Sequence, residues 1–500
     1  MLERTLYIVN ASLELQWYRW TSLLLLFFLT SSLAIDARQK MWNDELITLA
    51  VAKQRNLAEI VQAVKEGCDG APPAYAMAVH VFLLVVPNEA LAVRLPSTLG
   101  FLLMLPCLLV LSRRYLPASY AFAVALFAWH ICRYYATEGR SYGVVLGCGA
   151  ASLLCWRLAF IKKPPRIAAI LLALTLGIMV AMHYYAVFFV GPLFIAELMR
   201  VRNSRRWNIP VFAAMLVPLF VMTIHYPLIA ASSRGAAHFW SRPSFSMVPS
   251  FYYAYLIPLL YIGCPLALAV SFALPNRASR PHPLKSSLPV HEWVLAISLT
   301  GAPVLVIILS KYTTHAFVSR YALWGLIGIC FLVVAALSAA VHQNVATGVV
   351  LSLLLLGLII KNQTATYRIA PHLRDGEDAL QALESLPLSS DPIVVGNPHV
   401  FMELSYYAPV RIRERVVYLF NNSLDLKYYK SNSDPLILQA LRFRSPLAIR
   451  DYEDFLRNTR RFVLAAIPYD YLPWHLVGSG HRVAPLRDQS PPLIFMVSGK

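Results

Sequence analysis

Two neighbouring carboxylates stand close to the end of the first long apolar run of the sequence. Asp44 and Glu45 lie side by side in WNDELITLA, shortly after the almost uncharged stretch Trp20–Ile35. Ionisable groups are costly to hold near hydrocarbon, so residues at such places usually serve a function. A fixed carboxylate can act as a general base that takes a proton from a hydroxyl group. Both residues are therefore candidate catalytic groups.

Further polar residues recur at the ends of later apolar runs. Glu138 lies in RYYATEGRSY and is a third candidate catalytic group. Guanidinium groups can hold a phosphate or neutralise the charge that develops on a phosphate leaving group. Aromatic rings can stack on the faces of sugars. The candidate binding residues are Asp69, Arg140, Tyr142, His183, Tyr184, Arg320 and Tyr321.

These residues also have structural explanations, which the sequence leaves open. Asp44 and Glu45 are of the types favoured at a helix N-terminus. Asp69 could begin the turn at the Pro72-Pro73 pair, because Asp and Pro favour turns. The two carboxylates and Asp69 are therefore compatible with plain helix capping and turn formation as well as with chemistry.

The basic and aromatic candidates have similar alternatives. Glu138 and Arg140 could form an ion pair within their own loop. His183 and Tyr184 could belong to the aromatic belt at a membrane surface. Arg320 could anchor a helix end by extending its charged group to the interface.

The composition indicates a helical membrane protein. The 500 residues are 58% hydrophobic and only 14% charged, with a mean hydropathy of +0.56. Long apolar runs follow one another, and the first lacks a cleavage site, so we expect it to be retained as a span. The net charge of +18 lies in clusters between these runs rather than on a basic module with interleaved aromatics. The sequence therefore argues against nucleic-acid binding.

The basic clusters predict the orientation of the spans. Under the positive-inside rule, Arg113-Arg114, Lys162–Arg166, Arg200–Arg206 and Arg277–Lys285 mark cytoplasmic loops. This places the N-terminus in the cytoplasm and predicts about eleven spans. Those with stated bounds are Trp17–Ile35, Ala92–Leu111, Ala118–Arg133, Gly143–Ile161, Ile209–Tyr226, His291–Leu309 and Ala346–Ile360. All the candidate site residues then fall on the outer face.

The same layout predicts the domains. Residues 1–361 form a transmembrane catalytic domain, and residues 36–90 are its first outer loop, with an amphipathic helix over NDELITLAVAKQRNLAEIVQAVKEG and a second juxtamembrane helix. Residues 362–500 form a small outer α/β domain. Its strands are predicted at DPIVVG, RVVYLF and RFVLAAI, which are short runs rich in β-branched residues.

An ordered set of motifs resembles the GT-C glycosyltransferases. The motifs are WNDELITL, CDGAPPAYAMAVHVF, NEALAVRLPSTLGFLL, YYATEGRSYGVVL, MHYYAVFF, FWSRPSFS and VSRYAL, and together they cover more than half of the chain. They are similar to those of bacterial dolichyl-phosphate-mannose-protein mannosyltransferase-like proteins. That group includes relatives of the protein O-mannosyltransferases, the aminoarabinose transferases and the lipopolysaccharide-core galacturonosyltransferases.

The resemblance implies a role for several residues. Asp44 corresponds to the catalytic base, Glu138 to an acid that helps bind acceptor or metal, and Arg320 to the residue that grips the donor phosphate. Asp69 matches a family position, but the chain has DGAPP where many relatives have His before the Pro pair. No cofactor is required, although a divalent metal ion beside the carboxylates is compatible with this fold class.

The expected activity is transfer of a monosaccharide from a polyprenyl-phosphate-linked donor to a cell-envelope acceptor. The acceptor is a lipopolysaccharide, another glycolipid or a protein, and the reaction takes place at the periplasmic face of the bacterial inner membrane with inversion. The sequence does not name the sugar. The alternatives are a transporter or flippase of lipid-linked sugars and a non-catalytic scaffold that presents the C-terminal domain. Transport sites lie near the bilayer midplane, whereas these charges lie at span ends.

Overall fold

The computed structural model describes residues 2–161, 167–232, 238–258, 261, 263–273, 288–387, 389–486 and 493–499. The chain forms two compact units. The helical unit comprises Met1–Ala37, Arg94–Tyr226 and Ser241–Arg368. The α/β unit comprises Arg38–Val93, Pro227–Trp240 and Ile369–Lys500. Two of the predicted cytoplasmic clusters, Lys162–Arg166 and Arg277–Lys285, lie outside the described residues.

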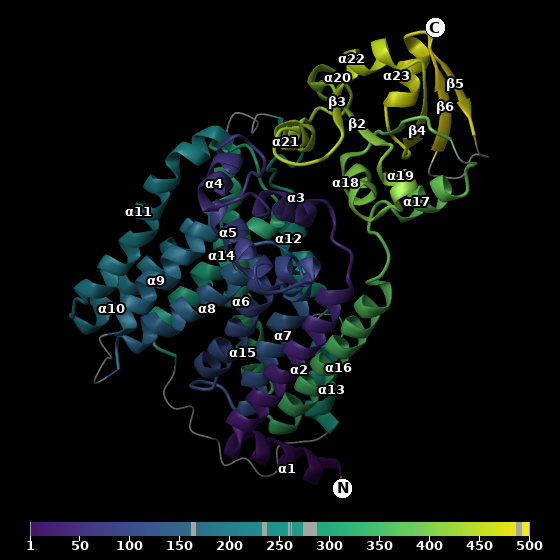
Figure 1. The fold of residues 1–500 in the computed structure, drawn as a ribbon. Coiled ribbons are helices and arrows are strands. Elements are labelled where there is room, and N and C mark those ends of the chain that lie inside the picture. Colours follow the sequence, from purple (N-terminus) through teal and green to yellow (C-terminus); the bar gives the residue numbers. More distant parts are fainter. Residues whose placement is uncertain are drawn as a thin grey trace. The chain divides into compact units, whose positions relative to one another are not determined.

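The helical unit is an all-α bundle (Figure 1). Its elements are α1 (Leu2–Leu15), α2 (Trp17–Arg38), α6 (Glu89–Ser112), α7 (Ala118–Ala136), α8 (Tyr142–Leu158), α9 (Ile167–Met182), η1 (Tyr184–Phe189), α10 (Val190–Ser204), α11 (Ile209–Ser232), α12 (Met247–Pro258), α13 (Cys264–Ala273), α14 (Val290–Tyr312), η4 (Ser319–Gly325), α15 (Leu326–Ala340) and α16 (Val345–Ile369). Within the described residues, seven helices are long and apolar enough to cross a membrane. The predicted polytopic membrane bundle is confirmed.

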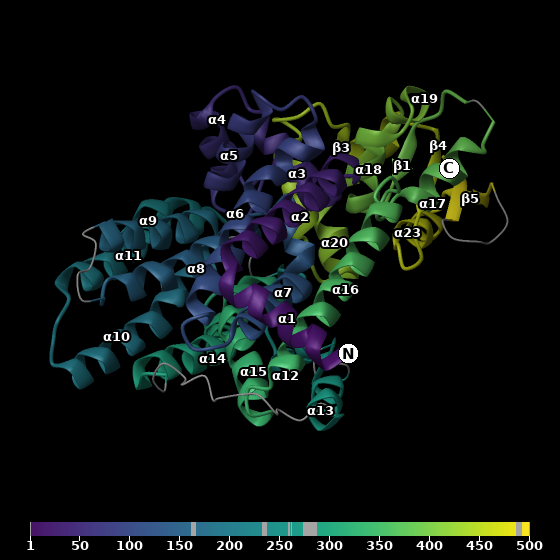
Figure 2. The same ribbon diagram turned by 90° about the horizontal axis from the view of Figure 1, so that it is seen from below.

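Packing in the bundle follows from side-chain size. Helix α7 is rich in alanine and is buried on nearly all sides, so neighbouring helices can approach it closely. Helix α15 packs against α7, α14 packs against α15 and α10, and α8 packs against α9. Figure 2 shows α8, α9, α10 and α11 side by side at one edge of the bundle. Because α7 has little exposed surface, it forms the centre of the unit.

Helices α6 and α8 meet backbone to backbone. Gly143 and Gly147 are four residues apart on α8 and face Ser97 and Gly100 of α6, respectively, a small-residue pattern that permits close helix contact. A Cβ atom on Gly147 would lie 1.9 Å from the carbonyl oxygen of Gly100, and one on Gly100 would lie 2.4 Å from Cα of Val144. The contact fixes where α8 begins, and therefore where the polar loop before it lies.

The α/β unit contains one mixed sheet and a set of short helices. Its helices are α3 (Asn43–Ala52), α4 (Leu57–Lys65), α5 (Pro73–Leu83), α17 (Glu377–Glu384), α18 (Pro398–Tyr407), α19 (Val410–Arg413), α20 (Asn422–Tyr428), α21 (Ser433–Leu441), α22 (Tyr452–Asn458) and α23 (Leu472–Gly478). Its strands are β1 (Ile393–Val395), β2 (Val416–Phe420), β3 (Ile449–Asp451), β4 (Arg461–Ala466), β5 (Arg482–Pro485) and β6 (Leu493–Ser498). The predicted strands correspond to β1, β2 and β4.

The sheet order is β3-β2-β1-β4-β6-β5. Strands β1 to β4 run parallel to one another, with Ile393 opposite Val416 and Val463, whereas β6 pairs antiparallel with β4 and β5. Strand β1 is buried at every position, as expected for a strand with neighbours on both sides and helices on its faces. The C-terminal part is therefore a small α/β domain, as predicted.

The first loop differs from the prediction in detail. The single amphipathic helix expected there is two helices, α3 and α4, because Asn56 begins a new helix and accepts a hydrogen bond from the Glu59 N–H at 3.0 Å. Only α4 has one polar and one apolar face, whereas α3 is buried at most positions. Helix α3 is thus an internal element rather than a surface helix.

The glycine contact between α6 and α8 gives a stability prediction. Gly147→Ala would force the two backbones apart, so we expect it to destabilise the protein by about 1–3 kcal/mol. The matched control is Gly301→Ala on α14, where an added Cβ meets nothing within 4 Å. Alanine favours a helix over glycine by about 1 kcal/mol, so this control should be neutral or stabilising. Thermal unfolding in detergent, followed by size-exclusion chromatography, measures both, and equal melting temperatures would contradict the close contact.

Candidate functional site

Four of the predicted site residues gather in the helical unit. The ring centres of Tyr142 and His183 lie 5.4 Å apart, and those of His183 and Tyr321 lie 5.0 Å apart. The guanidinium carbon of Arg320 lies 5.8 Å from the centre of the Tyr142 ring. Tyr185, which the sequence analysis did not include, extends this cluster at 4.8 Å from Tyr321. The starts of α8, η1 and η4 therefore bring one cation and several rings together.

Hydrogen bonds from α6 hold the loop that enters this cluster. Ser97 donates to the carbonyl oxygen of Tyr135 at 3.0 Å and accepts from the Gly143 N–H at 3.1 Å. The Thr98 hydroxyl oxygen lies 3.0 Å from the carbonyl oxygen of Ala136. Both ends of the segment that carries Glu138, Arg140 and Tyr142 are thus tied to a single helix turn.

Two positive charges act on the His183 ring. Burial, together with the charges of Arg140 and Arg320, lowers the pKa of His183 to about 3. Its imidazole is therefore neutral at physiological pH and serves as a hydrogen-bonding ring rather than as a cation. The positive charge of this region is carried by the two arginines.

Glu138 lies beside the same region but on its tyrosine side. Its side chain is buried, and it interacts electrostatically with Tyr135 and Tyr255, as Arg320 also does. The hydroxyl groups of these two tyrosines are 3.3 Å apart. Tyr184 is positioned differently, because its ring contacts His225 of α11 at 5.7 Å.

The first two carboxylates begin helix α3 in the α/β unit. The Glu45 side chain is buried and accepts a hydrogen bond from the backbone N–H of Trp42 at 3.3 Å, which satisfies a donor at the start of α3. Asp44 is in the first turn of the same helix and is only partly buried. The structure therefore gives Glu45 a clear role in capping and leaves Asp44 as the more accessible acid.

Asp69 forms the turn before the proline pair. One of its carboxylate oxygens accepts a hydrogen bond from the Ala71 N–H at 2.9 Å, and Pro73 begins α5. The turn explanation for Asp69 is thus confirmed, and its side chain is almost fully buried. Nearby, Tyr75 donates to the carbonyl oxygen of Val93 at 2.9 Å, which holds α5 in place.

The sequence analysis missed a buried polar group within the helical unit. Asp36 at the end of α2 and Arg94 in α6 are both fully buried. The Arg94 guanidinium donates to the carbonyl oxygen of Asp36 at 2.9 Å, and the Thr98 hydroxyl donates to its carboxylate at 2.7 Å. An arginine inside an apolar run is the signal that would have identified them.

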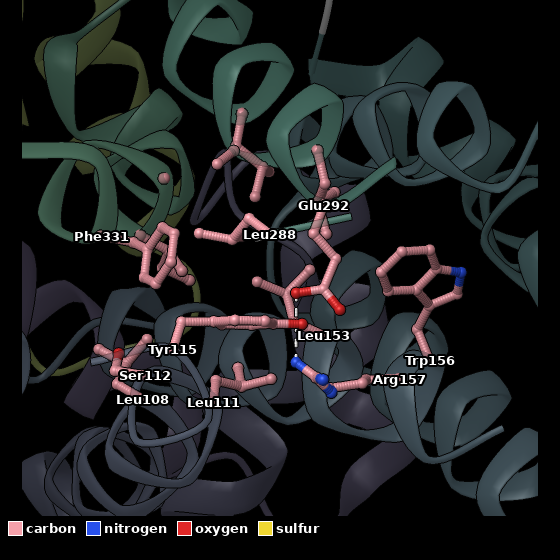
Figure 3. Close-up of a pocket in the computed structure, with 15 residues that line it drawn as sticks. Leu108, Leu111, Ser112, Tyr115, Leu153, Trp156, Arg157, Leu288, Glu292 and Phe331 are labelled. Carbon is pink, nitrogen blue, oxygen red and sulfur yellow. Dashed lines mark hydrogen bonds and ion pairs between the residues drawn. The ribbon is translucent and has the colours of Figure 1, made fainter. Parts of the chain in front are cut away.

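A cavity of about 70 Å³ lies at the other end of α8 and is separate from this cluster (Figure 3). Its polar corner is the ion pair between Arg157 and Glu292, whose atoms are 3.2 Å apart, beside Tyr115. Arg157 follows Tyr142 by 15 residues on one helix, which corresponds to about 22 Å along the helix axis. The cavity therefore cannot share a small substrate group with the aromatic cluster.

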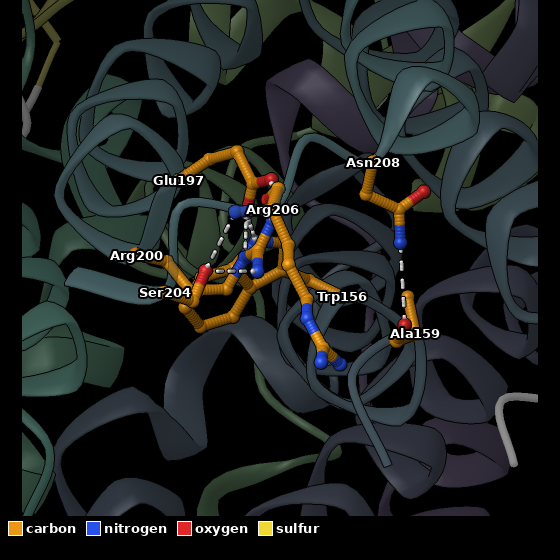
Figure 4. A network of polar contacts seen from close by, with 7 residues as sticks. All are labelled: Trp156, Ala159, Glu197, Arg200, Ser204, Arg206 and Asn208. Atoms are coloured by element: carbon orange, nitrogen blue, oxygen red, sulfur yellow. Dashed lines mark hydrogen bonds and ion pairs between the residues drawn. The ribbon is translucent and has the colours of Figure 1, made fainter. Parts of the chain in front are cut away.

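A second buried network joins α8, α10 and α11 (Figure 4). Arg200 makes two hydrogen bonds to the Glu197 carboxylate, at 2.8 and 2.9 Å, and the Trp156 indole donates to the same carboxylate at 3.1 Å. Asn208 donates to the carbonyl oxygen of Ala159 at 3.2 Å. Arg200, which the sequence analysis assigned to a basic loop cluster, is therefore an internal residue of the bundle.

The comparisons with known proteins define the class of fold. The chain has the GT-C glycosyltransferase fold, as its motifs indicated. Two of the similar solved structures are those of ArnT from Cupriavidus metallidurans. The apo state has a TM-score of 0.56 at 12% identity and covers 96% of this chain and 98% of that chain. The state bound to undecaprenyl phosphate has a TM-score of 0.55 at 13% identity, over 97% and 98%. No model of a protein family and no curated protein matches the sequence.

The α/β unit contains two buried acids that give a pH prediction. Burial raises the pKa of Glu403 from 4.5 to about 7, although the N–H groups of Asp375 and Gly376 donate to its carboxylate. Burial, together with the charge of Asp470, raises the pKa of Asp425 from 3.8 to about 7. At pH values between the unfolded and the folded pKa of each acid, the folded protein binds more protons than the unfolded protein. The two acids therefore stabilise the folded protein at low pH, and this stabilisation is lost as the pH rises through about 7.

We expect Glu403→Gln to reduce this loss. The neutral amide can still accept from both N–H groups, but it does not ionise. The melting temperature of the wild type should fall by a few degrees between about pH 5 and about pH 8, and that of the variant should fall less. Glu384→Gln at the end of α17 is the control, because this side chain is exposed. A variant with the wild-type slope would contradict the assignment.

Proposed function

We propose that the protein is a membrane glycosyltransferase that uses a polyprenyl-phosphate-linked sugar as donor. The observation that carries the proposal is the likeness of fold, over 97% of the chain, to a structure of ArnT bound to undecaprenyl phosphate. In the part of the chain that the structure describes, seven helices are long and apolar enough to cross a membrane, where the lipid of such a donor would lie. The acidic and basic residues of the chain supply the groups that transfer requires.

In the proposed reaction Asp44 is the general base. Its carboxylate takes the proton of an acceptor hydroxyl group, and the oxygen attacks the anomeric carbon of the donor. A carbon–oxygen bond forms there while the bond from that carbon to the phosphate oxygen breaks, with inversion of configuration. Asp44 lies in the first turn of α3, at the end of the helix that carries partial positive charge.

The other carboxylates have supporting roles in this proposal. Glu45 caps α3 and thereby fixes the residue next to it. Asp69 holds the turn that leads into α5. Glu138 lies in the segment held by Ser97 and Thr98, and we assign it to binding of the acceptor.

The leaving phosphate requires positive charge. Arg320 and Arg140 provide it, since both act electrostatically on the same ring, that of His183. The neutral His183 ring can add a hydrogen bond, and Tyr142 and Tyr321 offer rings to the sugar. These groups stabilise the transition state by neutralising the developing charge on the phosphate.

A divalent metal ion has no assigned place in the proposed reaction. Among the residues that the structure describes, no group of three or more His, Cys, Asp or Glu side chains is arranged to hold one. The proposed site is on the periplasmic face of the inner membrane, on the basis of the basic clusters of the sequence. The acceptor is a cell-envelope glycolipid or protein.

Asp44→Asn tests the role of the base. We expect it to lower kcat by about 100-fold to 10,000-fold, because general-base catalysis contributes about that much. The assay incubates protein in nanodiscs with a panel of polyprenyl-phosphate sugars and a membrane glycolipid extract, and mass spectrometry identifies the products. Asp378→Asn is a matched control, since Asp378 occupies the same position in the first turn of α17. If the folded Asp44→Asn protein transferred sugar at the wild-type rate, Asp44 would have no catalytic role and would serve only at the start of a helix.

Arg320→Gln tests the phosphate site without a turnover assay. The variant loses a guanidinium group that can make paired hydrogen bonds to phosphate, so we expect binding of undecaprenyl phosphate to weaken by about tenfold or more. Native mass spectrometry of the full-length protein measures the bound fraction. Arg206→Gln, at an exposed position after α10, is the control. Equal binding by both variants would remove Arg320 from the phosphate site.

A further inference from the structure

The three residues before α3 are held by the C-terminal part of the α/β unit. The Lys40 N–H donates to the carbonyl oxygen of Ala370 at 2.9 Å. The Met41 N–H donates to the hydroxyl oxygen of Tyr407 at 2.7 Å, and the Lys40 ammonium lies 4.6 Å from the centre of the Tyr407 ring. Segments more than 300 residues apart in the sequence therefore meet directly in front of α3.

Trp42 is the third of these residues and is also the N-cap of α3. Its side chain is buried, with an exposed fraction of 7%. The guanidinium carbon of Arg374 lies 4.2 Å from the centre of its ring, and the His399 ring meets it edge-on, at 6.4 Å and 73°. The backbone N–H of Trp42 donates a hydrogen bond to the Glu45 carboxylate. The residue that carries the indole ring is therefore linked directly to the first turn of α3.

The imidazole of His399 is held at both of its nitrogens. Nδ1 lies 3.4 Å from the Asp375 carboxylate, and Nε2 lies 3.4 Å from the Asp434 carboxylate. Burial lowers the pKa of His399, but the two carboxylates outweigh it and raise the pKa to about 10. Each nitrogen then carries a proton and faces a carboxylate, so a rotation of the ring would move it away from both partners. The other charged groups around it are Arg374 beside Asp375 and Glu403 one turn later on α18.

We propose that His399 is a positioning residue for the proposed catalytic base: held between Asp375 and Asp434, it fixes Trp42 together with Arg374, and so fixes the first turn of α3 that carries Asp44. The inference rests on the proposed function. The inference gives the C-terminal α/β domain a part in the reaction, because residues of α18 and of the segment before α17 hold the start of the helix that carries the base.

The physical argument is one of geometry. Asp44 is two residues after Trp42, within the same helical turn, so a displaced indole ring would move its carboxylate. A displacement of about 1 Å between reacting groups can lower a rate by about 100-fold. The donor phosphate is assigned to Arg320 in the helical unit, so its binding should not depend on His399.

His399→Gln in the full-length protein in nanodiscs is the first test. We expect kcat to fall by about 10-fold to 100-fold, with binding of undecaprenyl phosphate unchanged. His372→Gln is the matched control, because His372 also lies 3.4 Å from a carboxylate, that of Glu377, but its side chain is 63% exposed. A wild-type kcat in His399→Gln would overturn the proposal. Loss of kcat together with unfolding would also count against it.

The pH profile separates positioning from simple stabilisation. Asp434→Asn removes one of the two carboxylates, so His399 should lose its proton at a lower pH and the alkaline fall of kcat should begin earlier than in the wild type. His399→Gln should lack this fall. Identical profiles for the wild type and Asp434→Asn would contradict the role of the charge.

A measurement that does not depend on turnover distinguishes this inference from the proposed function. Hydrogen–deuterium exchange of peptides covering α3 should be faster in His399→Gln than in the wild type and in His372→Gln. Unchanged exchange in α3 overturns the positioning role. Absence of transfer by the wild type with every donor overturns the proposed function, and the exchange result still decides the positioning role.

Discussion

Charged groups beside hydrocarbon must find partners within the protein, and the rest of the structure depends on this constraint. An isolated ion in a medium of low dielectric constant is costly, whereas a paired and hydrogen-bonded ion is tolerated. Arg157 of α8 meets Glu292 of α14, and Arg200 meets Glu197 within α10, whose carboxylate also accepts a hydrogen bond from Trp156 of α8. Near the beginning of α8, the Arg94 guanidinium of α6 donates a hydrogen bond to the backbone carbonyl oxygen of Asp36. The buried charges thereby specify which helices are neighbours.

Close packing fixes the remaining freedom of the helical unit. The glycines of α6 and α8 bring two backbones together, and Ser97 and Thr98 then bind the loop that leads into α8. The loop residue Arg140 and the ring of Tyr142 are therefore placed by a contact that involves neither of them. Arg320 lies near them and adds positive charge to the region. The neutral ring of His183 lies there too and can accept a hydrogen bond. This combination suits a phosphate group that develops charge during a reaction.

The first outer loop and the C-terminal domain form one compact unit, which the linear domain boundaries did not indicate. Sequence analysis separated residues 36–90 from residues 362–500, whereas the structure groups Arg38–Val93 with Ile369–Lys500. The contacts of Trp42 with Arg374 and His399 show how this grouping is achieved. A domain without catalytic motifs of its own can thus contribute to a site by supporting a helix that carries the acid.

The sequence by itself determined the membrane bundle, the small α/β domain and the residue types available for chemistry. Hydropathy and β-branched runs are local properties, so α2, α6 and β4 could be predicted from their own residues. Two features depended on tertiary structure: the burial of Arg200, whose partner Glu197 also accepts a hydrogen bond from Trp156 of α8, and the meeting of Tyr142, His183 and Tyr321. Each rests on distances between segments far apart in the chain. Those distances are set by packing and by the pairing of buried charges, neither of which a single sequence displays.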